Sequence, residues 1–500
     1  MTVRFDPTSP ERFREVVTAR FGLTFDDSKL GFLADVLRRR ADARGLPVEV
    51  YMAEFESGVV DDEAGPLAEE LTVGETYFFR NSDQFRAFSE VVLPERMAAR
   101  AADRKLSFLS AACSSGEEPY TLAMLTRMIP SPPWQVSIRA VDLNPAALRK
   151  ATAARYTSWA LRETPPEAQR QWFAPAGREM ELSAEIRDAV RFDRRNLADP
   201  NSDIWQPDTY DAIFCRNVIM YFSQAMQQEV IGRIARSLAP GGFLFLGHAE
   251  TLRGLSQDFH LVHTHGTFYY QHKRDGDETP ARHHVDTMPL RVAPGIVPEP
   301  ADTSWYEAIG DASRRIEALA RPAEAPAAAA EPLPQWNLGV ALDLMQRERF
   351  AEALDLVGKM PAEAEENEEV LLLRAMLLVQ GGKLAAAAEV CRVLLEQDEL
   401  NAGANYVLAL CFEGAGDRRA AVHHYNVASY LDPQFAMPQL HLGLLSRRLG
   451  EPGARGELEK ALELLKREDA SRLLLFGGGF TRDALIRLCE AELRACEVKP

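Results

Sequence analysis

Long hydrophobic runs, paired cysteines and an excess of basic residues are all missing from this sequence of 500 residues. It contains no run of 18 or more apolar residues, the length that suggests a membrane-spanning helix. The opening segment MTVRFDPTSPERFREV also lacks the apolar core of a secretory signal peptide. We therefore expect a cytoplasmic protein, which would reach any partner in a membrane from the cytosolic side.

The six cysteines are scattered along the chain, and no two of them form a CxxC pair. Disulfide frameworks and zinc sites usually show grouped cysteines, so this distribution predicts reduced and mostly buried thiols. We see no set of metal ligands in the sequence and expect no bound metal. The cysteines are Cys113, Cys215, Cys391, Cys411, Cys489 and Cys496.

The formal net charge of −17 argues against a protein that binds nucleic acid over a broad surface. A local exception is the segment SKLGFLADVLRRRADARGL, whose apolar residues recur at three- and four-residue spacing and predict an amphipathic helix. Its basic group, Arg38, Arg39, Arg40 and Arg44, is either a solvated helix face or a surface that docks on an acidic partner. Composition alone leaves both interpretations open.

The length exceeds what one hydrophobic core supports, so we expect several domains. Short apolar runs alternate with helical stretches between about residues 105 and 272, as in LSFLSA (106–111) and YDAIFCRN (210–217). This alternation predicts a largely parallel α/β sheet. We predict five parts in chain order: an N-terminal helical domain (1–72), an α/β domain (73–274), a Pro/Ala-rich linker (275–334), a repeat array (335–468) and a C-terminal helical cap (469–500).

The region after the linker repeats with a period of 34 residues. Gly382, Gly416 and Gly450 mark the period, and a small residue precedes each glycine by seven positions. Two helices per repeat, with small side chains where they touch, resemble the tetratricopeptide (TPR) pattern. A generic array of helical hairpins is the alternative. Because the repeats contain no catalytic constellation, we predict that they form a protein-interaction surface.

The α/β segment contains a candidate ligand site. SFLSAACSSGEEPYTLAM (107–124) predicts a strand, a turn of small residues and a helix, which lets a ligand approach the backbone. The next predicted strand ends at Asp142 in IRAVDLNPAAL. An acidic residue there can hydrogen-bond a ribose diol, although a lone aspartate after a strand is often only a helix cap.

These motifs, taken together, are similar to one family. The motifs are, in chain order, GETYFFR (74–80), SAACSSGEEPYTLAM, AVDLNPAALRKA, FDRRNL, FCRNVIMYF (214–222) and APGGFLFLGHAETL. Their residues and their order resemble those of the chemotaxis receptor glutamate methyltransferases of CheR type. The resemblance covers about residues 10–272. It implies a Rossmann-like class I domain that uses S-adenosylmethionine (SAM), preceded by a helical subdomain and followed here by the all-α TPR array.

The resemblance also implies roles for particular residues. Cofactor-binding positions are expected at Gly74 (often asparagine in relatives), Thr76, Arg80, Glu117 (with Glu118 as an alternative), Asp142, Asn196, Leu197, Arg216 and Asn217. Tyr221 is expected near the reacting methyl group. An arginine between Arg96 and Arg104 is expected to orient the substrate carboxylate, and we take Arg96 for this role. Arg38, Arg39 and Arg40 are the expected receptor-docking residues.

The implied reaction is methyl transfer to glutamates of chemoreceptor cytoplasmic domains. A glutamate carboxylate is already ionised at neutral pH, so alignment of the reacting atoms is the main catalytic task. Two other interpretations stay open: a catalytically silent scaffold that acts through its repeats, and a SAM methyltransferase for another protein or a small molecule. The TPR partner, which the sequence does not identify, is expected to be a protein or peptide.

Overall fold

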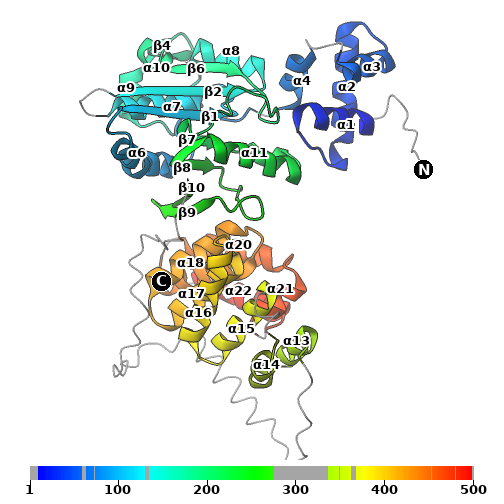
Figure 1. Cartoon of the computed structure of the whole chain (residues 1–500), viewed down its shortest axis with the longest axis vertical. Helices are drawn as coiled ribbons and strands as arrows, with labels where there is room; N and C mark the ends of the chain where they lie inside the picture. The colour runs from blue at the N-terminus through cyan, green and yellow to red at the C-terminus, as the bar shows by residue number, and fades with distance from the viewer. Residues whose placement is uncertain are drawn as a thin grey trace, which may run out of the picture. The chain divides into compact units, whose positions relative to one another are not determined.

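The computed structural model describes residues 10–58, 63–72, 74–129, 134–274, 336–347, 349–361, 367–451, 453–478 and 480–497. The chain divides into two compact units (Figure 1). The first contains the N-terminal helices and the sheets up to residue 274, and the second contains most of the helices after residue 336. The predicted linker at 275–334 lies outside the described residues. Within the described ranges, no helix has both the length and the apolar character needed to cross a membrane.

The N-terminal part of the first unit is helical, as expected. Its helices are α1 (Pro10–Phe21), α2 (Leu30–Arg44), α3 (Val48–Ser57) and α4 (Ala64–Leu71). The predicted amphipathic helix is α2, which buries Leu33, Val36 and Leu37. It ends at Gly45, whose φ of 65° allows the left-handed turn that caps the last carbonyl groups.

The main sheet has seven strands in the order β6-β2-β1-β7-β8-β10-β9. The first five are parallel to one another, and the β9–β10 hairpin adds antiparallel strands next to β8. From β1 the chain builds outward through β2 to β6, then returns to β7 on the other side of β1. Ligands bind at such a reversal point, beyond the carboxyl ends of the strands. The bounds are β1 (Lys105–Ala111), β2 (Gln135–Asp142), β6 (Val190–Arg194), β7 (Tyr210–Cys215), β8 (Leu238–Leu246), β9 (Phe259–Thr264) and β10 (Thr267–His272).

Helices connect the strands as the α/β prediction requires. The strand-to-helix turns that matter for the site come after β1 and β2, where α7 (Glu117–Arg127) and α8 (Pro145–Ala153) begin. Asn144 caps α8 by accepting hydrogen bonds from the N–H groups of Ala146 and Ala147. The other helices of this region are α5 (Ser82–Ala87), α6 (Leu93–Ala99), α9 (Pro166–Trp172), α10 (Ala184–Arg187) and α11 (Gln224–Ser237).

A second, three-stranded antiparallel sheet interrupts the α/β order, with the strand order β3-β5-β4. Its strands are β3 (Arg155–Tyr156), β4 (Phe173–Ala176) and β5 (Glu179–Leu182). The ring of Phe78 meets Tyr156 and Phe173 edge-on, with centroids 4.8 and 5.1 Å away. This small sheet is formed by residues that lie between β2 and β6 in the chain.

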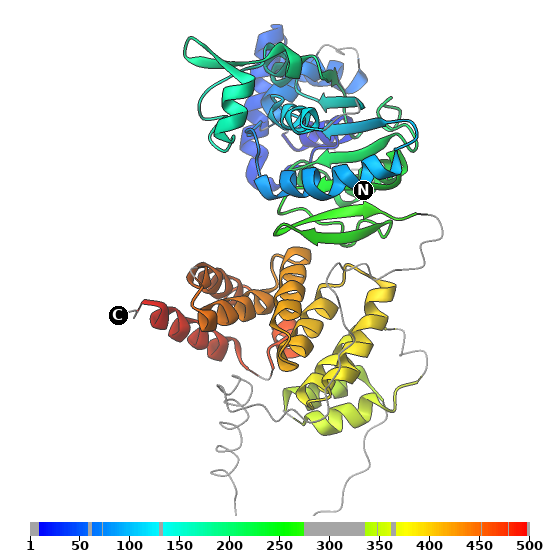
Figure 2. The same cartoon turned by 90° about the vertical axis from the view of Figure 1, so that its left-hand side faces the viewer.

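The second unit is all helical and consists of consecutive hairpins (Figure 2). The predicted period is confirmed, because Gly382, Gly416 and Gly450 follow the first helices of three hairpins with φ between 69° and 83°. At Gly443 a Cβ atom would lie 2.8 Å from Leu458, so the small residue allows the two helices to touch. The helices are α13 (Leu338–Gln346), α14 (Phe350–Val357), α15 (Glu368–Gln380), α16 (Leu384–Gln397), α17 (Ala402–Gly414), α18 (Arg418–Leu431), α19 (Ala436–Leu449), α20 (Ala454–Leu465), α21 (Ala470–Phe476) and α22 (Arg482–Glu497).

Candidate active site

A pocket of about 860 Å³ opens at the carboxyl ends of β1 and β2. This volume is typical of small-molecule sites. The pocket brings together most of the residues predicted from the sequence, although they lie up to 147 positions apart, between Gly74 and Tyr221. The predicted residues that line it are Gly74, Thr76, Arg80, Glu118, Asp142, Asn196, Leu197, Arg216, Asn217 and Tyr221.

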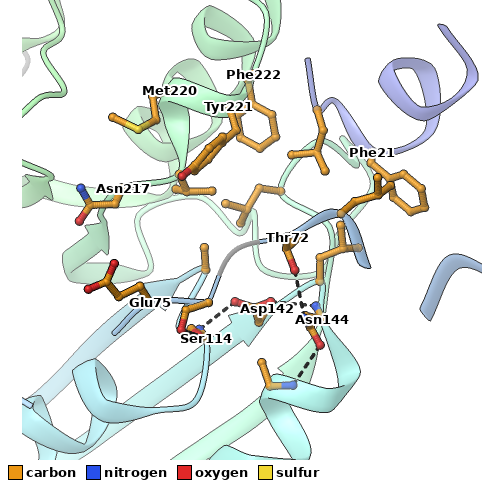
Figure 3. Close-up of a pocket in the computed structure, with 18 of the residues that line it drawn as sticks. Phe21, Thr72, Glu75, Ser114, Asp142, Asn144, Asn217, Met220, Tyr221 and Phe222 are labelled. Atoms are coloured by element: carbon orange, nitrogen blue, oxygen red, sulfur yellow. Dashed lines mark hydrogen bonds between the residues drawn. The ribbon is translucent and has the colours of Figure 1, made fainter. Parts of the chain in front are cut away.

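Asp142 lies at the floor of the pocket, at the last position of β2. Its carboxylate accepts hydrogen bonds from the N–H groups of Ser114 and Asn144, each at 2.8 Å (Figure 3). Burial raises the pKa of Asp142, and these backbone bonds act in the opposite direction by stabilising the charged form. The turn after β1 is thus attached to the end of β2, and the remaining acceptor sites of the carboxylate are available to a ligand.

Glu118, rather than Glu117, is the acidic residue of α7 that lines the pocket. Glu118 accepts from the hydroxyl of Ser110 at 2.7 Å and forms an ion pair with Arg216 at 3.1 Å. Glu117 is buried and accepts from the hydroxyl of Ser115, and burial raises its pKa. The structure therefore places Glu118, the alternative in the sequence analysis, where Glu117 was expected.

Arg216 links two walls of the pocket. Besides the pair with Glu118, its guanidinium donates a hydrogen bond of 2.6 Å to the carbonyl oxygen of Arg80. Burial lowers the pKa of Arg216, and the Glu118 carboxylate opposes this effect. The Nε atom of Arg216 is buried and has no partner among the described residues. An unpaired buried donor in a pocket is a position where a ligand acceptor would be stabilised.

The segment 74–80 forms another wall. Gly74 and Thr76 line the pocket, and the carbonyl oxygen of Gly74 accepts from the hydroxyl of Ser114 at 3.2 Å. A Cβ atom at Gly74 would lie 3.0 Å from that hydroxyl oxygen, which leaves little room for a larger residue. The guanidinium of Arg80 donates to the carbonyl oxygen of Glu75 at 2.9 Å and lies on the same pocket surface.

Asn196 and Leu197 line the pocket beyond the end of β6. The Asn196 side chain donates to the carbonyl oxygen of Arg20 at 3.0 Å and accepts from the N–H of Ala198. Its amide is therefore used to fix the loop against α1, while Leu197, 6% exposed, contributes apolar surface. These contacts give Asn196 a positioning role in the wall of the pocket.

The loop after β7 carries Asn217 and Tyr221 and faces Asp142 across the pocket (Figure 3). Asn217 has a φ of 57°, so the chain turns sharply there. Tyr221 closes a short 3-10 helix, Ile219–Tyr221, and its side chain is 43% exposed. The loop thus leaves an aromatic ring at the mouth of the pocket, in contact with solvent.

Glu250 holds this loop, and the sequence analysis did not single it out. Its buried carboxylate accepts hydrogen bonds from five backbone N–H groups, at 2.7 to 3.3 Å. The donors are Asn217, Val218, Ile219, Met220 and Gly247. A Cβ atom at Gly247 would lie 2.8 Å from this carboxylate, so glycine is needed there. The sequence signal was present in GHAETL, as a glutamate three residues after the glycine that follows an apolar strand.

The N-terminal helical part supplies a wall that the sequence analysis also missed. Phe21, Leu23, Phe25 and Phe32 line the pocket from this side. The backbone N–H of Thr24 donates to the carbonyl oxygen of Tyr221 at 2.8 Å. The helical subdomain therefore completes the pocket.

Arg96 lies away from the pocket, and its expected role as the substrate-orienting arginine is corrected. The side chain is 2% exposed and pairs with the equally buried Asp211 at 2.8 Å. It also donates to the carbonyl oxygen of Pro240, and Asp211 accepts from the N–H of Ser107. These bonds join α6 to β1, β7 and β8, so the geometry gives Arg96 a structural role.

The three expected docking arginines differ from one another. Arg38 and Arg39 are more than half exposed and pair with Asp35 and Glu70. Arg40 is largely buried and forms a two-bond pair with Glu63, at 2.9 and 3.0 Å. Arg40 is therefore corrected from a docking residue to a structural one, whereas Arg38 and Arg39 are accessible.

Comparisons with known proteins agree with this geometry. The model of the CheR methyltransferase SAM-binding domain matches residues 74–268. Chemotaxis protein methyltransferase 1 of Vibrio cholerae is 33% identical over 268 residues, 52% of this chain and 88% of that protein. The probable biofilm formation methyltransferases WspC of Pseudomonas putida and Pseudomonas aeruginosa are 28% and 25% identical, each over 90% of this chain, and over 97% and 98% of those proteins. The chain therefore belongs to the CheR methyltransferase family and is a SAM-dependent protein methyltransferase.

Proposed function

We propose that this chain transfers the methyl group of SAM to glutamate side chains of methyl-accepting chemoreceptors. The products are glutamate methyl esters and S-adenosylhomocysteine. The observation that carries the proposal is the pocket, in which Asp142, the Glu118–Arg216 pair and Tyr221 share one surface that is open at the tyrosine. The names of the chemotaxis methyltransferase relatives support this class of substrate.

The polar groups of the pocket match the parts of SAM. Asp142, at the end of β2, would accept hydrogen bonds from the ribose hydroxyls. Glu118 would face the methionyl ammonium, and the Arg80 guanidinium would pair with the carboxylate. Asn196 and Leu197 would flank the adenine, and Arg216 and Asn217 would border the sulfonium. SAM supplies an activated methyl group, and the chain supplies the binding and orientation.

The lining also suits a substrate that needs no general base. No histidine occurs among the described residues that line the pocket, and burial raises the pKa of its cysteine, Cys113, well above the usual value. A glutamate carboxylate is ionised without assistance, so it can attack once it is aligned and partly desolvated. Tyr221, at the mouth, would order the incoming side chain.

Docking is proposed to use the exposed part of the basic helix. Arg38 and Arg39 present accessible guanidinium groups, which would attract the acidic surface of a receptor bundle. We propose residues 1–72 as the docking domain, 73–274 as the catalytic domain, 335–468 as a TPR module that binds a protein or peptide partner, and 469–500 as its cap. The proposed linker, 275–334, would let the two parts fold separately.

We further propose that the receptor belongs to a system controlling biofilm formation. The WspC relatives match this chain along 90% of its length, whereas the chemotaxis methyltransferases match only about half of it. The shared C-terminal part therefore distinguishes the two groups. Deleting the gene and restoring it with an Arg80→Ala variant should lower biofilm mass and leave swimming unchanged. A loss of swimming alone would contradict this assignment.

The test of the main proposal is transfer of radiolabelled methyl groups from SAM to a panel of receptor cytoplasmic fragments. Labelling should disappear when the candidate glutamates are replaced by alanine. Methyl esters should release methanol in mild alkali, whereas methylated amines should retain the label. Binding of SAM without any transfer would favour a silent scaffold. Alkali-stable labelling, or labelling of another acceptor, would favour a different methyltransferase.

A further inference from the structure

The helical array has an inner face formed by the first helices of its hairpins. We define it by Leu372 of α15, Gly403 and Tyr406 of α17, and Phe435, which directly precedes α19. In TPR arrays the corresponding concave face is the one that binds partners. Here the inner face is covered by α21, a seven-residue helix from the same chain that also contacts α13 and α15 (Figure 1).

The contact centres on Phe476. Its ring meets Tyr406 edge-on with centroids 5.6 Å apart, and lies 5.0 Å from the ring of Phe435. A Cβ atom on Gly403 would lie 3.1 Å from the Phe476 ring, so the glycine makes room for it. The Tyr406 hydroxyl lies 3.2 Å from the carbonyl oxygen of Phe476 and donates to it. Leu473, three residues earlier on α21, is the second buried apolar anchor.

An acidic anchor precedes the helix. Glu468, 5% exposed, accepts a 2.6 Å hydrogen bond from the N–H of Ala436, the first residue of α19. Asp469 then caps α21 by accepting from the N–H groups of Ser471 and Arg472. The segment thus presents an acidic residue, a leucine and an aromatic residue, at spacings of five and three.

Closing the end of the array does not require α21. That task belongs to α22, which packs on α20 and α19 and buries Leu485 and Cys489. Between α20 and α22 the chain crosses the inner face and turns back at Gly477 and Gly478, the latter with a φ of 63°. A helix of seven residues is also too short to be stable alone, so its contacts hold it in place.

We propose that α21 is a built-in ligand of the TPR module. The partner is then an amphipathic helix that carries an acidic residue, a leucine and an aromatic residue at the same spacing, and it binds by displacing α21. This inference rests on the proposed partner-binding role of the module and does not depend on methyl transfer. Tethering gives α21 a high effective concentration, so only a partner with better contacts displaces it.

The test uses the full-length chain and a fluorescein-labelled peptide of residues 466–478, KREDASRLLLFGG. Leu473→Asp combined with Phe476→Asp releases α21 from the face. The matched control, Ala470→Asp with Ser471→Asp, places the same charge on exposed positions of α21. Fluorescence polarisation should show the released variant binding the peptide at least about 30-fold more tightly than the parent or the control. Adding Gly403→Leu to the released variant should abolish this binding.

A released variant that is folded by circular dichroism but binds no more tightly than the control would overturn the proposal. So would equally tight binding to the parent. If the released variant loses its helical signal in circular dichroism, the proposal is tested instead by hydrogen exchange of the backbone amides in the parent protein. Amides of α21 should exchange at least about tenfold faster than those of α17 and α22, and equal protection would make α21 an integral part of the array. Methyl transfer, measured on the same samples, should not change, and its failure in every sample would concern only the catalytic proposal.

Discussion

The pocket of the first unit and the inner face of the second show two different ways to prepare a binding surface. The pocket is open, and backbone bonds to buried carboxylates hold its walls. The inner face is apolar, and a helix of the same chain covers it. An open pocket with a few fixed polar groups suits a cofactor that binds and leaves in each reaction cycle. A covered apolar face suits a partner that must compete for its place.

The largest effect should come from the residue that holds the loop of the pocket. Glu250→Leu leaves five backbone N–H groups without their acceptor, and each unsatisfied buried donor costs about 1–3 kcal/mol when water cannot replace it. We expect methyl transfer to fall by at least about 100-fold, equivalent to roughly 3 kcal/mol. The exposed Glu167→Leu serves as the control. Because Glu250 acts by positioning the loop, SAM affinity should fall less in Glu250→Gln than in Glu250→Leu. Equal SAM affinity in the two Glu250 variants would argue against this role.

The next effect concerns the floor of the pocket. Asp142→Ala should weaken SAM binding by about 1–3 kcal/mol, because charge-assisted hydrogen bonds to the ribose are lost. Calorimetry on this variant and on the exposed Asp103→Ala measures the difference. Burial raises the pKa of Asp142, so SAM affinity should begin to fall on acidification at a higher pH than for an ordinary aspartate. Parent-like binding by Asp142→Ala would remove Asp142 from the site.

The third effect, a smaller change in SAM affinity, should distinguish the two adjacent glutamates of α7, Glu117 and Glu118. Glu118→Gln weakens the pair with Arg216 and the proposed contact with the ammonium, so SAM affinity should drop about tenfold. Glu117→Gln leaves the pocket lining intact, and its effect should appear in thermal stability with little change in affinity. The reverse pattern would restore Glu117 as the cofactor ligand.

The smallest effect belongs to the docking surface. Arg38→Glu with Arg39→Glu should reduce methylation of an acidic receptor fragment several-fold and leave SAM affinity unchanged, because the charges steer association. Parent activity should also fall with added salt. The test omits Arg40, since its substitution would leave the buried Glu63 without its partner. Salt-insensitive methylation would favour the solvated-face interpretation.

The sequence predicted much of this architecture because periodicity and strand-end chemistry are local. The 34-residue spacing of Gly382, Gly416 and Gly450 identified the hairpins, and Asp142 was found from its place after an apolar run. Glu117 and Glu118 are adjacent, so only the rotation of α7 decides which one faces the pocket. That rotation depends on packing against the sheet, which the local sequence does not specify.

The remaining differences come from contacts between distant residues. Arg96 pairs with Asp211, 115 positions later, and no local pattern announces such a partner. The wall contributed by Phe21 and Phe25 requires the helical subdomain to pack beside the loop that carries Tyr221. The segment 469–500, predicted as a cap, contains α22, which packs on α20 and α19, and α21, which contacts α13 and α15. A short apolar helix with an aspartate cap gives no local sign of the surface that it will cover.

The most direct test of the central claim is methyl transfer from labelled SAM to a receptor cytoplasmic fragment, followed by alkaline release of methanol. The account predicts a label on the receptor fragment that alkali releases. This label should be lost when the receptor glutamates or Asp142 are replaced, and it should be retained when Glu117 is replaced by glutamine. Label that resists alkali, or that persists after every candidate glutamate has been replaced, would contradict the claim.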